Sequence, residues 1–326
     1  MEPIRWGILG TGTIAGKFAE GLSVLDDAEL VAVGSRAQGT ADRFAGAWDV
    51  PHGHPSYRAL AGDPDVDVVY VATPHPMHKE NTILCLEAGK AVLCEKPLTV
   101  NAQQAGQVIS CARECGLFLM EAVWTRFLPA IERLRELLAE GAVGELRLLK
   151  ADFCFRSGWN PEGRLLNPAL AGGALLDVGC YTISLASMVF GCPPRRVTGL
   201  ADIGQTGVDE QSAVIQDHGG GRLAVLTCAV RTRTLHEAYL YGTDGYIRVH
   251  HPFWHASKLT VVRGGEEELL QLPYEGNGYN YEAAEVGRCL REGRLESEVM
   301  PLDESLSTMA TMDRLRAQWD LTYPME

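Results

Sequence analysis

Residues 4–15 read IRWGILGTGTIA: an apolar run, a glycine turn and the start of a helical pattern. Gly10 and Gly12 begin a G-x-G-x-x-(G/A) motif, in which the first glycine permits a tight turn and the second lets the backbone approach a pyrophosphate. The motif follows a strand-like run and opens a helix, whose N-terminal N–H groups favour anions. We therefore expect Gly10, Gly12, Thr13 and Ile14 to bind a dinucleotide.

Outward from this motif, short apolar runs alternate with helical patterns as far as residue 122. The strand-like runs lie at 4–9, 30–35, 66–73, 91–94 and 117–121, and the helical patterns at 14–25, 40–48, 76–88 and 101–115. Apolar strands that alternate with helices form a parallel sheet covered on both faces. The sequence therefore predicts an α/β fold that starts with a doubly wound Rossmann sheet.

The pattern changes after residue 123. Helical patterns lie at 128–138, 173–190, 279–291 and 303–321, and strand-like runs at 145–155, 195–202, 208–217, 222–231, 236–242, 246–250 and 258–263. Successive strands without helices between them indicate a mostly antiparallel sheet. We predict an NADP-binding Rossmann domain at 1–122 and a substrate-binding and oligomerisation domain at 123–326, and we interpret Glu266–Glu268 as a solvated turn.

Composition narrows the possible partners. The 326 residues include 29 Lys+Arg and 42 Asp+Glu, a net charge of −13 that argues against nucleic acid and anionic membranes as partners. We find no apolar run near the ~20 residues that span a bilayer and no secretory signal. Nine cysteines without a CxxC motif favour a cytoplasmic protein and argue against a zinc site, so we expect no bound metal.

The second strand ends at Gly34-Ser35-Arg36. Domains that bind NAD usually place an acidic residue there to accept a hydrogen bond from the ribose 2′-OH. A guanidinium pairs instead with a 2′-phosphate, and a hydroxyl donates to it. Ser35 and Arg36 therefore favour NADP over NAD.

Two further motifs follow strands at the edge where such sheets bind ligands. The third strand leads into Thr73-Pro74-His75-Pro76-Met77-His78, from which we expect Thr73, Pro74, His75 and His78 to contact the cofactor. The fourth leads into Glu95-Lys96-Pro97. A lysine there can polarise a substrate oxygen or lower the pKa of a neighbouring acid.

Four stretches of the chain resemble one protein family. They are GILGTGTIA at 7–15, VATPHPMHKE at 71–80, VLCEKPLTVNAQQA at 92–105 and GGALLDVGCYTISLA at 172–186. They are similar to the glucose–fructose oxidoreductase / inositol dehydrogenase / MocA family, and most similar to its branch of trans-dihydrodiol dehydrogenases and NADP-dependent D-xylose 1-dehydrogenases. The resemblance covers essentially the whole chain.

The resemblance implies a Rossmann domain followed by an α/β domain with a large, mostly antiparallel sheet, whose open face commonly forms an oligomer interface. A homodimer is the state we expect. It also implies that Lys96 is catalytic and binds substrate, and that a second site motif lies at Asp177–Tyr181. We expect Glu95 and Lys96 to contact the cofactor as well. Many members carry His where this chain has Tyr181, which counts against inositol dehydrogenase.

These residues suit one reaction. Asp177 and Tyr181 are four apart, on one face of a helix starting near Gly173. A tyrosine pKa is about 10 unless a nearby cation lowers it, and Lys96 can supply that cation. Tyr181 would take the hydroxyl proton as hydride leaves for the nicotinamide, and Asp177 would orient the hydroxyl or hold Lys96. Either Tyr181 or Lys96 is the immediate proton carrier.

Four other residues complete the predicted site. Trp124 and Arg126 lie where the chain leaves the Rossmann domain, and we expect both to contact substrate. Trp159 and Arg164 lie in a segment that resembles the xylose dehydrogenases. We expect Trp159 to contact substrate and Arg164 the cofactor.

Together these features predict an NADP-dependent oxidoreductase acting on a small polyol or carbonyl compound, either a sugar or a cyclic trans-diol. One alternative is an NADPH-dependent reductase of a keto or anhydro sugar, which needs the same groups in reverse. Another is a regulatory protein that senses a dinucleotide without catalysis. Such a sensor has no need for the set Lys96, Asp177 and Tyr181.

Overall fold

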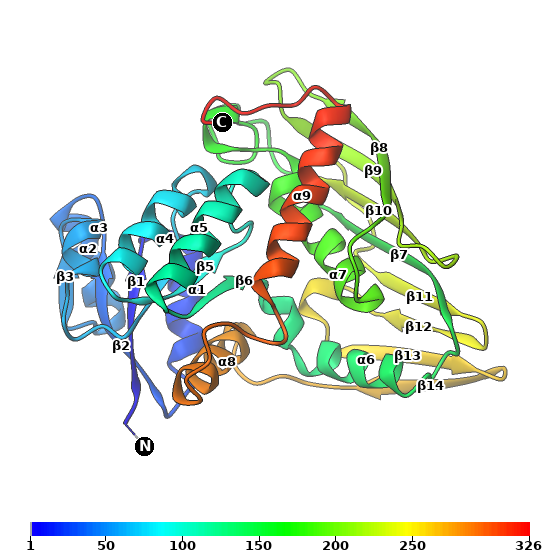
Figure 1. The fold of residues 1–326 in the computed structure, drawn as a ribbon, viewed down its shortest axis with the longest axis horizontal. Coiled ribbons are helices and arrows are strands. Elements are labelled where there is room, and N and C mark those ends of the chain that lie inside the picture. Colours follow the sequence, from blue (N-terminus) through cyan, green and yellow to red (C-terminus); the bar gives the residue numbers. More distant parts are fainter. Residues whose placement is uncertain (1) are drawn as a thin grey trace. The chain divides into compact units, whose positions relative to one another are not determined.

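The structure is a computed structural model that describes residues 2–326 and divides into two compact units (Figure 1). The first unit contains the chain up to Trp124 together with Glu275–Ser305. The second contains Thr125–Tyr274 and Leu306–Glu326. The first unit therefore includes a segment from late in the chain that lies within the predicted range 123–326. The roles assigned to the two predicted domains stay a prediction.

The first unit is built on a parallel sheet of six strands in the order β3-β2-β1-β4-β5-β6. Its elements are β1 (Ile4–Leu9), α1 (Thr13–Leu22), β2 (Ala28–Gly34), α2 (Gln38–Trp48), β3 (His52–His54), α3 (Tyr57–Ala61), β4 (Val68–Val71), η1 (His75–Met77), α4 (His78–Glu87), β5 (Ala91–Glu95), α5 (Ala102–Cys115), β6 (Leu119–Ala122) and α8 (Tyr279–Arg291). This strand order is that of a Rossmann sheet, and it confirms the predicted fold.

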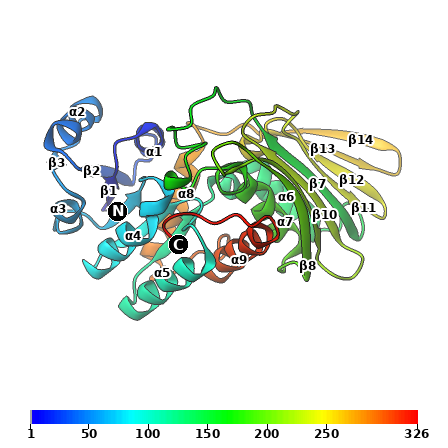
Figure 2. The ribbon, with the colours of Figure 1, turned by 90° about the horizontal axis from the view of Figure 1, so that it is seen from above.

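Apolar side chains explain why these strands lie at the centre of the unit. Every residue of β4 and β5 is buried, as expected of parallel strands covered on both faces. Figure 2 shows α1 on one side of the sheet and α4 and α5 on the other. Phe18 of α1 stacks on Tyr70 of β4, with ring centroids 3.7 Å apart.

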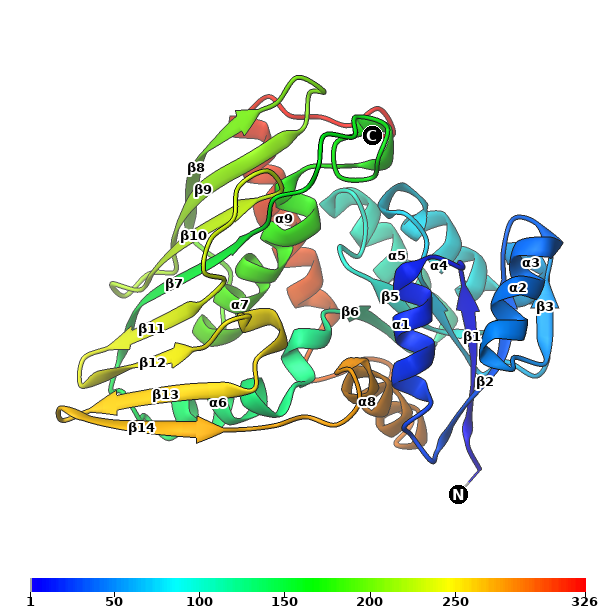
Figure 3. The same cartoon turned by 180° about the vertical axis from the view of Figure 1, so that it is seen from behind.

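Helix α8 lies alongside α1 although more than 250 residues separate them in sequence (Figure 3). A Cβ added to Gly21 would lie 2.9 Å from Cβ of Tyr279, so the two helices approach closely at this glycine. The backbone N–H of Leu119 in β6 donates to the carbonyl of Leu295. The late segment thus completes the first unit.

The second unit is built on an eight-stranded sheet in the order β14-β13-β12-β11-β7-β10-β9-β8. Its elements are α6 (Pro129–Ala139), β7 (Leu146–Cys154), η3 (Pro168–Leu170), η4 (Leu175–Gly179), α7 (Cys180–Phe190), β8 (Arg196–Ile203), β9 (Asp209–Asp217), β10 (Leu223–Ala229), β11 (Ala238–Gly242), β12 (Gly245–Val249), η5 (Phe253–His255), β13 (Lys258–Arg263), β14 (Glu266–Gln271) and most of α9 (Leu302–Gln318). Only β10 and β7 pair in parallel, so the predicted, mostly antiparallel sheet is confirmed.

The two faces of this sheet differ. In Figure 2 the helices α6, α7 and α9 all lie on one side of it. Within the described part of the chain, no helix covers the other side. That side exposes apolar residues of neighbouring strands, among them Leu200, which is 82% exposed, Ile215 and Val225.

One segment, Pro168–Phe190, has the length and apolar composition of a membrane-spanning helix, although the sequence analysis found no such run. In the structure 89% of its apolar window is buried inside the protein. The segment contains α7, whose apolar residues pack on β7 and β10. Its hydropathy is therefore explained by its position in the core.

One expectation about local structure was wrong, and another was confirmed in extent but not in detail. Glu266–Glu268 was interpreted as a solvated turn but lies in the edge strand β14, where exposed charges are tolerated. The helix expected over 173–190 is present, but its first part is η4, a π-helical turn at Leu175–Gly179, followed by α7. That turn was not visible in the apolar pattern.

Candidate active site

The glycine turn has the geometry that a pyrophosphate requires. Gly10 has φ +115°, and a Cβ there would lie 2.8 Å from the backbone oxygen of Ala72. A Cβ on Gly12, the N-cap of α1, would meet no atom within 4 Å, and no side chain caps this helix. The N–H groups at the start of α1, beginning with Thr13 and Ile14, are therefore open to a phosphate. The residues present fit an NAD(P) dinucleotide.

The end of β2 carries the two residues predicted to select NADP. Ser35 is buried, with its Oγ 2.6 Å from Oγ1 of Thr40 and its N–H donating to the carbonyl of His54. Arg36 follows in the loop before α2 and is exposed. Ser35 is thus covered, whereas the charged side chain of Arg36 is open to solvent at the end of β2.

His78 joins two of the predicted loops. Its Nε2 lies 2.7 Å from the carbonyl of Thr73, and its Nδ1 lies 2.8 Å from the carbonyl of Pro97. Burial lowers the pKa of His78, the two carbonyls oppose that shift, and the charge of Lys96 adds to it. The contacts of His78 therefore set the positions of the loops after β4 and β5. His75 lies beside it in η1, with ring centroids 5.7 Å apart.

Lys96 follows a buried acid network. Glu95, the last residue of β5, accepts a short hydrogen bond from the hydroxyl of Tyr70 and another, of 3.2 Å, from the backbone N–H of Lys96. Glu282 of α8 is completely buried nearby, and neither of its carboxyl oxygens has a hydrogen-bond partner among the described residues. Burial and then the charge of Glu95 raise the pKa of Glu282 well above its usual range. Burial and the neighbouring charge therefore favour the protonated form of Glu282.

The second unit holds Asp177 and Tyr181 at the junction of η4 and α7. Asp177 is buried and accepts a hydrogen bond from Nη1 of Arg164 at 2.6 Å. Tyr181 is also buried, with its ring centroid 5.5 Å from that of Phe153. Arg164 was predicted to contact the cofactor, and the structure adds its ion pair with Asp177. A π-helical turn in this position is often associated with functional sites.

Buried polar groups hold this helical segment at its N-terminal end and within α7. At the N-terminal end, Oδ2 of Asp209 accepts a hydrogen bond of 2.7 Å from the N–H of Leu175. Burial raises the pKa of Asp209 to about 7. Further along, the guanidinium of Arg126 donates to Oγ and to the backbone oxygen of Ser184. Arg126 was predicted to contact substrate, and in the structure it holds α7.

Two predicted substrate contacts lie elsewhere. Trp124 is buried in the first unit, where its ring stacks on Tyr279 with centroids 4.6 Å apart. Trp159 is 50% exposed in the second unit, and the guanidinium of Arg231 lies 5.6 Å from its ring centroid. Their roles toward substrate stay predictions.

The predicted residues of the first unit meet at one edge of its sheet. The N–H of Gly10 donates to the carbonyl of Gly34, and Gly10 also lies against Ala72, so the loops after β1, β2 and β4 are neighbours. Lys96 follows the adjacent strand β5.

Sequence reasoning missed Glu282 and Asp209. An acid within an apolar helical stripe is the only signal that would have suggested Glu282.

Comparison with known proteins agrees with this geometry. Residues 4–123 match the sequence profile of an oxidoreductase family with an NAD-binding Rossmann fold, and residues 131–248 match that of the GFO/IDH/MocA C-terminal domain. The family match, together with the fold and the glycine turn, thus defines an NAD(P)-binding oxidoreductase. The chain is 40% identical to trans-1,2-dihydrobenzene-1,2-diol dehydrogenase of Mus musculus over 334 residues, and 40% identical to that of Homo sapiens over 333 residues. Each alignment covers 99% of both chains. The chain belongs to the GFO/IDH/MocA oxidoreductase family, as its motifs predicted.

Solved structures share the whole fold. A 3-ketoreductase from Actinomadura kijaniata, in complex with NADP and TDP-benzene, matches with a TM-score of 0.88 and 27% identity, covering 97% of this chain and 98% of that chain. An aldose–aldose oxidoreductase from Caulobacter crescentus, complexed with glycerol, matches with a TM-score of 0.89 and 22% identity over 99% of this chain and 100% of that chain. The second likeness concerns the fold alone.

Proposed function

We propose that this oxidoreductase uses NADP to transfer a hydride between the nicotinamide and a hydroxyl or carbonyl group of a small sugar or cyclic trans-diol. The observation that carries the proposal is the position of Lys96 at the ligand-binding edge of the Rossmann sheet, in a chain 40% identical throughout to trans-diol dehydrogenases. The acidic composition fits a small-molecule substrate and neither nucleic acid nor a membrane.

The cofactor proposal rests on residues of the first unit. Gly10 and Gly12 leave the N-terminus of α1 open for the pyrophosphate. Arg36 is the exposed charge at the end of β2, and a guanidinium there pairs with a 2′-phosphate. The 27% identical ketoreductase was solved with NADP, which supports the same choice here.

The proton steps are assigned to three side chains. The nicotinamide, when bound, accepts or supplies the hydride. In oxidation Tyr181 takes the proton of the substrate hydroxyl, and in reduction it returns the proton to the alkoxide oxygen. A phenol with an ordinary pKa of about 10 needs a cation for this role, and Lys96 is assigned that function. Asp177, held by Arg164, orients the hydroxyl.

The first experiment follows NADPH absorbance with a panel of aldoses and trans-diols, using NADP+ and NAD+ side by side. We expect turnover with NADP+ that falls by about 100- to 10,000-fold in Tyr181→Phe and Lys96→Met. Binding of NADPH, measured by its fluorescence, should persist in both variants. The matched control Lys258→Met removes an exposed lysine from the second unit and should leave turnover unchanged.

Two results would contradict the proposal. Full turnover in both variants would remove Lys96 and Tyr181 from the reaction. NADPH binding without turnover of any diol, sugar, keto sugar or anhydro sugar would favour a dinucleotide sensor.

Variants of the ketoreductase with a lysine or a tyrosine replaced were also solved, and these are the residue types assigned here.

One observation favours a second candidate function, the reduction of a carbonyl group with NADPH. The 27% identical relative with NADP bound is a 3-ketoreductase, and the same three side chains serve reduction. Turnover of keto or anhydro sugars with NADPH, without oxidation of any diol or aldose, would favour this candidate.

We also propose that the chain forms a homodimer in the cytoplasm through the open face of the second unit's sheet. The exposed apolar side chains on that face support the interface. Among the described residues none of the nine cysteines forms a disulfide, which suits a reducing compartment.

A further inference from the structure

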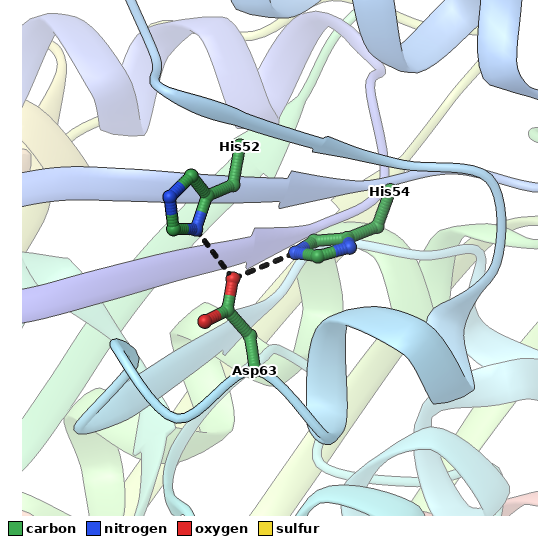
Figure 4. Close-up of side chains that lie close together, drawn as sticks. All are labelled: His52, His54 and Asp63. Carbon is green, nitrogen blue, oxygen red and sulfur yellow. Dashed lines mark hydrogen bonds and ion pairs between the residues drawn. The ribbon is translucent and has the colours of Figure 1, made fainter.

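The outer edge of the Rossmann sheet carries a cluster of two histidines and an aspartate that the proposed reaction does not use (Figure 4). His52 and His54 are two residues apart on β3, so both side chains lie on the same face of the strand. His52 Nδ1 and His54 Nε2 each donate to Oδ2 of Asp63 over 2.7 Å. Three potential ligand atoms therefore converge on one point.

We propose that His52 Nδ1, His54 Nε2 and Asp63 Oδ2 bind one divalent transition-metal ion of the zinc class. The three atoms lie within 4.8 Å of one another. Tetrahedral zinc, with bonds of about 2.0–2.2 Å, separates its ligand atoms by roughly 3.4 Å. The 2.7 Å hydrogen bonds therefore lengthen by roughly 0.7 Å to admit the ion. Imidazole suits zinc and its neighbours in the periodic table, whereas Mg²⁺ and Ca²⁺ prefer oxygen ligands alone.

The surroundings hold the aspartate in the orientation that a ligand needs. Oδ1 of Asp63 accepts the backbone N–H of Asp65 at 2.9 Å, and Nζ of Lys90 donates to the carbonyl of Asp63 at 2.6 Å. These bonds leave Oδ2 to face the histidines. The other ring nitrogen of His52, Nε2, lies 3.9 Å from the carboxylate of Asp65. That distance is too long for a hydrogen bond, so Asp65 places negative charge beside His52 without fixing the orientation of its ring.

Exposure and charge also suit a bound cation. The side chain of Asp63 is 3% exposed, whereas that of His52 is 38% exposed, so the site opens toward solvent on the histidine side. A fourth position there would hold water. Asp65 and Asp67 lie nearby with Arg5 between them, at 3.4 Å and 2.7 Å.

The charges around the site can be summed. Three carboxylates carry negative charge, those of Asp63, Asp65 and Asp67. Arg5 and Lys90 carry the two positive charges. These side chains leave one net negative charge beside the cluster, which favours a bound cation.

The competing explanation is a hydrogen-bond network that fastens β3 to the loop after α3 and binds no ion. Both explanations predict that removing a member of the cluster lowers stability. Only the metal site predicts a specific response to added metal, so metal binding to the full chain is the property to measure.

The experiment is a calorimetric titration of the full-length, chelator-treated protein with Zn²⁺. We expect one ion per chain, and a loss of affinity of at least tenfold in His54→Gln and in Asp63→Asn. The control variant His251→Gln changes an exposed histidine of the second unit and should bind like the unaltered protein. Absence of binding to the unaltered protein, or equal binding in all of these variants, overturns the proposal.

A second measurement guards against binding to cysteine and against misfolded variants. Cys111 and Cys115 lie one helical turn apart on α5 and are accessible enough to bind a soft metal. Co²⁺ added to the unaltered protein should give a nitrogen–oxygen ligand-field spectrum without thiolate charge-transfer bands, unchanged in a Cys111→Ser, Cys115→Ser double variant. Thiolate bands that vanish in that double variant would assign the bound ion to the cysteines and overturn the histidine site.

Discussion

Arg36 is the residue that distinguishes the two forms of the cofactor in our proposal. Changing Arg36→Asp replaces a partner of the 2′-phosphate with a group that repels it and accepts from a ribose hydroxyl. We expect the ratio of kcat/KM for NADP+ to that for NAD+ to fall by about 10- to 100-fold. Steady-state kinetics with both cofactors measures it.

The control for this substitution lies on the adjacent helix α2. Arg43→Asp makes the same charge change at an exposed position and should leave the cofactor ratio unaltered. An unchanged ratio of kcat/KM for the two cofactors in Arg36→Asp would show that the loop after β2 does not recognise the 2′-phosphate. An equal change in both variants would assign the effect to net charge.

Glu282 gives a prediction with a definite sign. Its pKa is raised in the folded state by burial and then by Glu95, so the folded protein keeps a proton that the unfolded chain releases near the ordinary glutamate pKa of 4.5. Its contribution to stability is therefore fully present below that pH and declines as pH rises towards the folded-state pKa. We expect Glu282→Gln to raise the unfolding temperature at pH of about 8 and to change little at pH of about 4.

Glu285, one turn along the same helix, supplies the opposite control. Burial acts to raise its pKa, but hydrogen bonds from Ser297 and Arg288 dominate and lower it. Glu285→Gln should therefore destabilise the protein at neutral pH and lose that effect in acid. Thermal unfolding over a pH series compares the two variants, and equal pH profiles for both would refute the charge assignment of Glu282.

At the scale of elements, the π-helical turn η4 depends on Asp209. Asp209→Ala leaves the N–H of Leu175 without an acceptor in a buried place, which costs about 1–3 kcal/mol of unfolding free energy. We expect kcat to fall as well, because the turn carries Asp177. Asp209→Asn keeps an amide oxygen for the N–H and should retain most of the stability and activity.

The pH dependence of this contact follows from its pKa. Asp209 has a folded pKa of about 7 against an ordinary aspartate value of 3.8, so its contribution to stability is lost as pH rises from about 4 to about 7. Asp209→Asn should flatten that part of the stability curve in denaturant titrations. A curve as steep as that of the unaltered protein would place the titrating group elsewhere.

An element can be predicted from the sequence when its burial imposes a clear apolar pattern on its residues. The buried strands β1 and β4 were visible as apolar runs, and the glycine turn between β1 and α1 as a motif. The strand β3 reads His-Gly-His and has no apolar pattern, so it was missed, and the acids of β14 suggested a turn. The motifs likewise predicted Lys96, but the ion pair between Arg164 and Asp177 depends on packing that no spacing reveals.

At the scale of the whole molecule, the register of the second unit's sheet places apolar side chains and one lysine side by side across its open face. Val225 stands opposite Ile215 on one side and Lys150 on the other, and Tyr241 stands opposite Leu148. Cross-strand neighbours of this kind share one face. We expect Val225→Glu to convert the proposed dimer into a monomer, with the molar mass measured by light scattering during size-exclusion chromatography.

The control for the dimer is Val24→Glu, which adds the same charge at an apolar residue of the first unit that is 48% exposed. Its molar mass should equal that of the unaltered protein. A monomer in the unaltered protein, or an unchanged dimer in Val225→Glu, would rule out this face as the interface.

The discontinuous first unit has a consequence for how the protein is made. Because Glu275–Ser305 completes this unit, the first 124 residues leave the ribosome without the helix that packs against α1 and without the stacking partner of Trp124. Chains usually fold domain by domain from the N-terminus during synthesis. Here all eight strands of the second sheet are translated before α8, which completes the Rossmann unit. Until α8 is made, the apolar surface that it covers in the Rossmann unit stays exposed.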